Sequence, residues 1–151
     1  MLRRGTQGSI NNAIVAFFTD FAVNIDEPET AGYLEGGDLA VVDSFVFENA
    51  GGEDWPADID TVAGDETTDD IDEAAFFNDN AVALGLSIGT DPALTDPLNL
   101  DAPDFLPTDL SPVLGAGATP PADDFFDPTA TFIGAIGDDD WTAGWTAYPA
   151  N

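Results

Sequence analysis

The chain has 151 residues, of which 30 are acidic and two are basic, and its formal net charge is −28. It contains no histidine and no cysteine, and its only basic residues are Arg3 and Arg4. This composition excludes imidazole or thiolate catalysis, the usual zinc sites, lysine Schiff bases and a P-loop lysine. It also excludes nucleic acid and anionic membranes as partners, because Lys and Arg are needed to neutralise their phosphates.

The hydrophobic content of 44%, with eleven Phe and three Trp, is enough for a packed core, and the length predicts one domain over residues 1–151. The longest apolar run covers residues 13–18, far below the ~20 residues of a membrane span, so no membrane insertion is expected. The first residues lack the apolar stretch of a signal peptide. If the protein is exported, we expect its signal to lie upstream.

Strand patterns dominate the first third of the chain. Residues 9–18 are rich in β-branched and aromatic side chains, and residues 21–25 form a second short apolar run. Residues 28–35 predict a helical turn, because Pro28 stands near its start and Gly36 ends it. Residues 39–47 are the clearest strand. Brief corners without Asn-Gly or Asp-Gly hairpin signals favour a sheet that winds rather than one folded into hairpins.

Residues 53–73 form an acidic insertion, and two interpretations of it remain open. One is a solvated acidic surface, suited to a saline environment in which salt screens repulsion between carboxylates. The other is a calcium site, since Ca²⁺ prefers six to eight oxygen ligands. The EF-hand spacing is absent. The candidate metal ligands are Asp58, Asp60, Asp65, Glu66, Asp69 and Asp70.

The remaining residues predict a short helix and a long irregular tail. A helical turn is expected over residues 70–77, and residues 75–82 echo residues 16–23, which is either a structural repeat or chance. After Gly89, frequent X-Pro pairs favour extended chain. Interspersed Leu and Phe side chains there need burial, so we expect a Pro-rich ribbon that wraps another surface.

Three segments resemble a type of bacterial exported surface protein, the largely uncharacterised, lipoprotein-like right-handed parallel β-helices. Residues 2–15 resemble a late rung of these proteins, and residues 104–117 resemble the segment that often follows the last rungs. Residues 125–146, with Phe132 and Trp141, are similar to their closing signature. The resemblance implies an all-β, right-handed parallel β-helix (solenoid) with rungs over residues 5–52, the insertion over 53–73, and a later rung and tail over 74–151.

We therefore predict a non-catalytic structural or adhesion scaffold, extracellular or at the cell surface, that belongs to a longer exported precursor. No enzyme activity is expected: the lyases that share the resembled fold need a basic residue, and the only ones here are Arg3 and Arg4 at the start, while the hydrolases of that fold use a His and an Arg-Lys segment that this sequence does not match. A pair of carboxylates ~5–10 Å apart could still hydrolyse a glycoside, but thirty acidic residues would give such a spacing by accident. Two alternatives remain: a carbohydrate-binding module, with or without Ca²⁺, and the non-catalytic end of a larger glycan-processing enzyme. Trp141, Trp145 and Tyr148 could pack on the fold or stack on sugar rings. Expected partners are upstream rungs, a second copy at the N-terminal edge, or polysaccharide.

Overall fold

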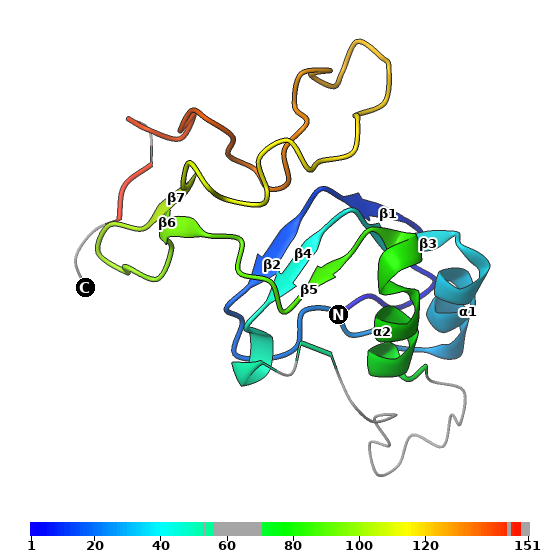
Figure 1. The fold of residues 1–151 in the computed structure, drawn as a ribbon. Coiled ribbons are helices and arrows are strands. Elements are labelled where there is room, and N and C mark those ends of the chain that lie inside the picture. Colours follow the sequence, from blue (N-terminus) through cyan, green and yellow to red (C-terminus); the bar gives the residue numbers. More distant parts are fainter. Residues whose placement is uncertain (53, 56–70, 145, 149–151) are drawn as a thin grey trace. The chain divides into compact units, whose positions relative to one another are not determined.

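The chain forms two compact units, Met1–Thr90 and Asp91–Asn151, in the computed structural model (Figure 1). The structure describes residues 1–52, 54–55, 71–144 and 146–148. No helix in these ranges is both long and apolar enough to cross a membrane.

The first unit is built on short parallel strands. Strand β1 (Gly8–Asn11) pairs with β3 (Leu39–Val42), and Gly8 lies opposite Leu39. A separate sheet has the order β2-β4-β5, formed by Ile14–Ala16, Phe45–Phe47 and Ser87–Ile88. A single parallel bridge joins Leu2 to Ile25. Segments that are distant in the sequence are therefore held side by side by backbone hydrogen bonds.

Residues in the left-handed backbone conformation lie between each strand of the β1-β3 sheet and the strand of the β2-β4-β5 sheet that follows it in the sequence. Asn12 has a φ of 53° between β1 and β2, and Asp43 has a φ of 48° between β3 and β4. Gly85, with a φ of 66°, takes the corresponding place before β5. A side chain at Gly85 would meet the Asp43 carboxylate as well as adopt a strained conformation. These corners limit each strand to a few residues.

Both helices of the first unit lie beside its strands (Figure 1). Helix α1 (Pro28–Gly36) begins with a proline and ends at Gly37, which is left-handed. Helix α2 (Glu73–Leu84) is capped by Asp72 and ends at Gly85. Helix α1 contacts β3 and α2 contacts β5, while a short 3-10 helix, η1 (Asn49–Gly51), follows β4.

The core of the first unit lies between the strands and the helices. Val41, Val46 and Phe77 are fully buried, and the Trp55 ring stacks on Phe77 with 4.1 Å between the ring centroids. Burial of this apolar surface, at roughly 25 cal/mol per Å², is the main stabilising contribution. The other buried apolar side chains of the cluster are Val23, Ile25, Ala31, Leu34, Leu39 and Leu86.

The second unit contains little regular structure. Strands β6 (Leu94–Asp96) and β7 (Asp104–Pro107) form an antiparallel pair. Further along, the Ile133 amide donates to the Val113 carbonyl at 3.0 Å, and both side chains are buried. This unit is therefore held by a few backbone bonds and a small apolar centre.

The prediction of an all-β right-handed parallel β-helix is wrong. The strands are short and belong to three separate small sheets, one of which is antiparallel, and two helices complete a mixed α/β fold. Parallel pairing between the first strand segment and residues 39–47 is present. The paired runs are only two to four residues long, and α1 and α2 stand in the sequence between successive paired segments, so no regular rungs form.

Several predicted elements also differ from the observed ones. Residues 9–18 and 39–47 each divide into two strands, because a left-handed residue interrupts each run. Residues 21–25 contribute one bridge rather than a strand. The expected turn at 70–77 is a longer helix, Glu73–Leu84, which contains several strong helix formers. Since residues 75–82 are helical and residues 16–23 are not, their sequence echo is no structural repeat.

Candidate functional site

Asn49 is the centre of a buried polar cluster at the end of β4. Its side-chain amide donates to the Val15 carbonyl at 2.9 Å and to Asp54 Oδ1 at 2.8 Å. Its Oδ1 accepts from the Phe18 amide at 3.2 Å, and its own amide donates to Asp54 Oδ1 at 2.9 Å. Asn49 is fully buried and Asp54 is nearly so. The cluster thus fastens the end of β2 to the chain that follows β4.

Other buried polar side chains in the first unit have the same kind of partner. Ser44 Oγ accepts from the Ala13 amide at 3.0 Å and donates to the Val42 carbonyl at 2.7 Å. Thr30 Oγ1 accepts from the Gly5 amide at 3.1 Å. Glu73 Oε1 accepts from the Ile25 amide at 2.8 Å. Each of these bonds satisfies a backbone group that would otherwise be costly to bury.

Ser111 plays a similar part in the second unit. Its hydroxyl donates to the Pro92 carbonyl and accepts from the Val113 amide at 3.3 Å. The residue is buried. The buried side chains of Asn49, Ser44, Thr30, Glu73 and Ser111 therefore join one chain segment to another, whereas the buried indole N–H of Trp55 has no hydrogen-bond partner among the described residues.

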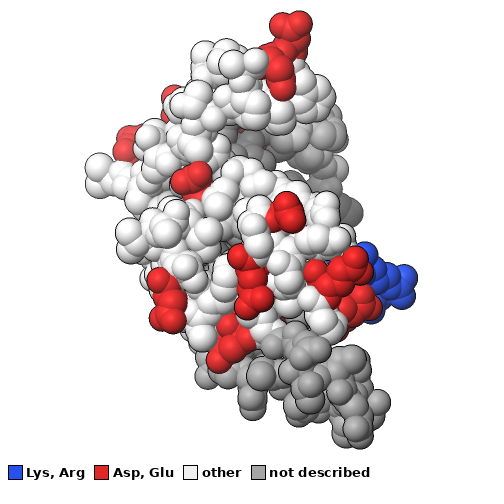
Figure 2. All heavy atoms as spheres, turned by 90° about the vertical axis from the view of Figure 1, so that its right-hand side faces the viewer, with Lys and Arg blue, Asp and Glu red and all other residues white. Residues whose placement is uncertain are grey.

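The predicted metal ligands Asp58, Asp60, Asp65, Glu66, Asp69 and Asp70 lie outside the described residues. Within the described ranges, no group of three or more acidic side chains is placed to hold a metal ion. Figure 2 shows acidic side chains spread in several places over one face, with Arg side chains beside one acidic group at its edge.

The aromatic residues of the C-terminal segment are exposed. Trp141 is 56% exposed, and its indole N–H donates to the Ala135 carbonyl at 2.7 Å. Tyr148 is 43% exposed, and Trp145 lies outside the described residues. The hydrogen bond to Ala135 fixes the position of the Trp141 ring, but about half of the residue is exposed to solvent. Trp141 is therefore only partly packed on the fold.

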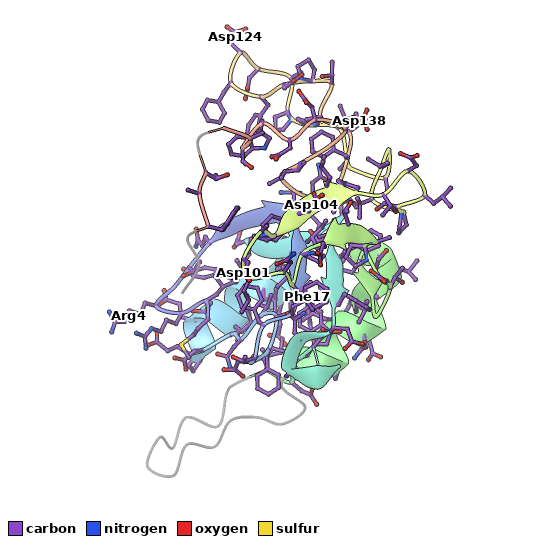
Figure 3. The ribbon with its side chains drawn as sticks, turned by 90° about the vertical axis from the view of Figure 1, so that its left-hand side faces the viewer. Arg4, Phe17, Asp101, Asp104, Asp124 and Asp138 are labelled. Atoms are coloured by element: carbon purple, nitrogen blue, oxygen red, sulfur yellow. The ribbon has the colours of Figure 1, made fainter. Side chains whose placement is uncertain are left out.

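Acidic residues of the second unit form tight local turns. Asp140 Oδ1 accepts from the Thr142 amide at 2.9 Å and from the Thr142 hydroxyl at 2.6 Å. Asp127 makes the same two bonds with Thr129, whose hydroxyl above all holds the pKa of the Asp127 carboxyl below its usual value. Asp124 and Asp138 lie on separate loops (Figure 3). Such carboxylates stabilise turns rather than converge on a ligand.

Sequence reasoning missed the buried cluster around Asn49. Asn49 lies just beyond the predicted strand at residues 39–47, and its long-range partners Val15 and Phe18 carry no polar side chain that would indicate the contact. The available signal is an Asn two residues after an apolar strand, before Gly51 and Gly52.

No protein-family model, curated protein or solved structure matches the chain. The resemblance of residues 2–15, 104–117 and 125–146 to exported surface proteins stays a sequence-based prediction.

Proposed function

We propose that this chain is a non-catalytic structural or adhesion scaffold of the extracellular space or the cell surface. The observation that carries the proposal is the use of the buried polar side chains. Asn49, Ser44, Thr30 and Ser111 bond the backbone of another segment. Residues used in this way rigidify a fold, and their hydrogen-bonding groups are not presented to a substrate.

The surface chemistry supports a saline, exposed setting. A net charge of −28 on 151 residues favours solubility, and the repulsion that it causes is weakened by salt. The sequence contains no cysteine, so no disulfide of the chain depends on the redox state of its surroundings.

Turnover assays test the non-catalytic part of this proposal. The chain would be incubated with a panel of plant, algal and bacterial polysaccharides while new reducing ends and unsaturated uronates are measured. We expect no product above a heat-denatured control. Turnover that disappears when one carboxylate is replaced would overturn the proposal and would identify a catalytic acid.

A carbohydrate-binding function is the second candidate, and the exposure of Trp141 favours it. Its anchored indole leaves ring surface open to solvent, and Asp138, Asp139 and Asp140 directly precede it. Aromatic rings offer a large rigid apolar surface, and carboxylates accept hydrogen bonds from hydroxyl groups. A sugar ring has apolar and hydroxyl-bearing surfaces that match both groups.

Binding to a glycan array, followed by titration calorimetry, tests this second candidate. We expect Trp141→Ala to weaken binding about tenfold, which corresponds to ~1.4 kcal/mol. Phe125→Ala is the matched control, because Phe125 is an 86% exposed aromatic residue of the same unit and should leave binding unchanged. A chelator arm separates Ca²⁺-assisted from metal-independent binding. Equal losses in both variants would indicate general aromatic adhesiveness instead of a sugar site.

A further inference from the structure

The first unit has an uncharged sheet edge in an otherwise strongly acidic chain. Among the described residues, β1 pairs only with β3, so β1 is an edge strand. Residues 5–19, which include β1 and β2, contain no charged residue and no proline, and they are the longest uncharged stretch of the sequence. Natural edge strands are usually protected by charges, proline or a bulge. This edge lacks the first two.

The backbone groups of β1 alternate between β3 and the open side. The Gly8 amide donates to the Asp38 carbonyl at 2.9 Å, so Gly8 and Ile10 face β3. In a parallel ladder the intervening residues, Ser9 and Asn11, then direct their N–H and C=O groups away from β3. All four residues of β1 are exposed. The edge therefore offers two donors and two acceptors at the spacing of a β-ladder.

We propose that β1 pairs antiparallel with β1 of a second copy of this chain, about a two-fold axis at Ile10. In this register Ser9 lies opposite Asn11 of the second copy, and the two residues exchange both backbone hydrogen bonds. The two Ile10 residues form the central non-hydrogen-bonded pair, in which side chains approach most closely. Pairing converts two marginal two-stranded β1-β3 sheets into one four-stranded sheet.

Charge and side-chain pattern identify a second copy as the occupant. A cationic partner strand would find no carboxylate on β1, whereas a second β1 is equally neutral. Ile10 is 37% exposed, and a second Ile10 would cover it. Asn11 Nδ2 donates to Ser9 Oγ at 2.8 Å, so both polar side chains lie on one face, where they meet the same pair of the second copy. Figure 3 shows Arg4 projecting from the chain that leads into β1.

Sedimentation equilibrium in low salt and in about 1 M NaCl tests the pairing, because a Debye length of ~3 Å removes the repulsion between the two acidic bodies. We expect a monomer in low salt and a monomer–dimer equilibrium in high salt. Ile10→Lys places two like charges across the axis and should raise the dimer dissociation constant about tenfold or more. Ser9→Pro removes an N–H donor that faces away from β3 and leaves the β1–β3 hydrogen bonds in place. It should also raise the dimer dissociation constant.

Val82→Lys is the matched control, because Val82 is 97% exposed on α2 and the substitution adds the same charge far from β1 in the sequence. It should dimerise like the unaltered chain. Circular dichroism would establish that each variant is folded. A monomer for the unaltered chain in high salt, or equal weakening by Val82→Lys and Ile10→Lys, would overturn the proposal. Either result would mean that β1 does not pair with a second copy of this chain.

Discussion

At the scale of single residues, the fully buried side chain of Asn49 bonds the backbone at Val15 and Phe18 and the side chain of Asp54. Replacement by Ala would leave the Phe18 amide and Asp54 Oδ1 without their Asn49 side-chain bonds. We predict that Asn49→Ala lowers the free energy of unfolding by about 2 kcal/mol, since unsatisfied buried groups are costly. Denaturant titration measures this change.

The matched control for this prediction is Asn78→Ala. Asn78 is exposed on α2, and its side chain donates only to the Ala74 carbonyl within the same helix. We expect a change within about 0.5 kcal/mol. Similar losses for both variants would show that the cluster around Asn49 contributes no special stability.

Asp127 provides a prediction about protonation. Hydrogen bonds from the hydroxyl and the amide of Thr129 lower the pKa of the Asp127 carboxyl. Because this pKa is lower in the folded state, the turn is stabilised above the unfolded pKa, and this contribution is lost as the pH falls through the folded pKa. We predict that Thr129→Val raises the titration midpoint of Asp127, as followed by carboxyl NMR shifts. Thr95→Val, which removes a hydroxyl bonded to the Leu106 carbonyl, should leave that midpoint unchanged.

At the scale of elements, α2 depends on its N-terminal cap. The Ala75 amide donates to Asp72 Oδ1 at 2.8 Å, and the low content of Gly and β-branched residues then lets the helix continue to Leu84. We predict that Asp72→Ala destabilises the first unit by about 1 kcal/mol in thermal or chemical unfolding.

Asp79→Ala is the control for the cap, because it removes the same charge from an exposed position within α2. Ala has the higher helix propensity, so this variant should be as stable as the unaltered chain or slightly more stable. If both variants lost stability to the same extent, the charge rather than the cap would be responsible.

At the scale of the whole molecule, the stability should follow the ionic strength. Thirty acidic residues repel one another more strongly in a compact state than in an expanded chain, and salt screens this repulsion without a specific site. We predict that the melting temperature rises steadily across a NaCl titration. A strong rise at micromolar Ca²⁺, with little effect of NaCl, would instead establish a calcium site and favour the candidate ligands Asp58, Asp60, Asp65, Glu66, Asp69 and Asp70.

The sequence by itself determined the features that depend on local chemistry. Pro28 and Gly36 located α1 closely, and the apolar runs at residues 9–18 and 39–47 located the paired strand segments. Composition alone excluded catalysis by an imidazole, a thiolate or a lysine amine, because the chain contains no His, Cys or Lys. Such conclusions need no knowledge of which segments meet.

Only the tertiary structure decided how far each element extends and what its polar residues contact. Non-glycine residues such as Asn12 and Asp43 take left-handed conformations, which their own sequence only weakly favours, so strands that looked continuous are broken there. Residues 75–82 follow a cap at Asp72 and become helical, although a similar run at residues 16–23 does not. Asn49 reaches Val15 across 34 positions of the sequence. A contact of this length is set by how strands pair, and no local pattern encodes the pairing.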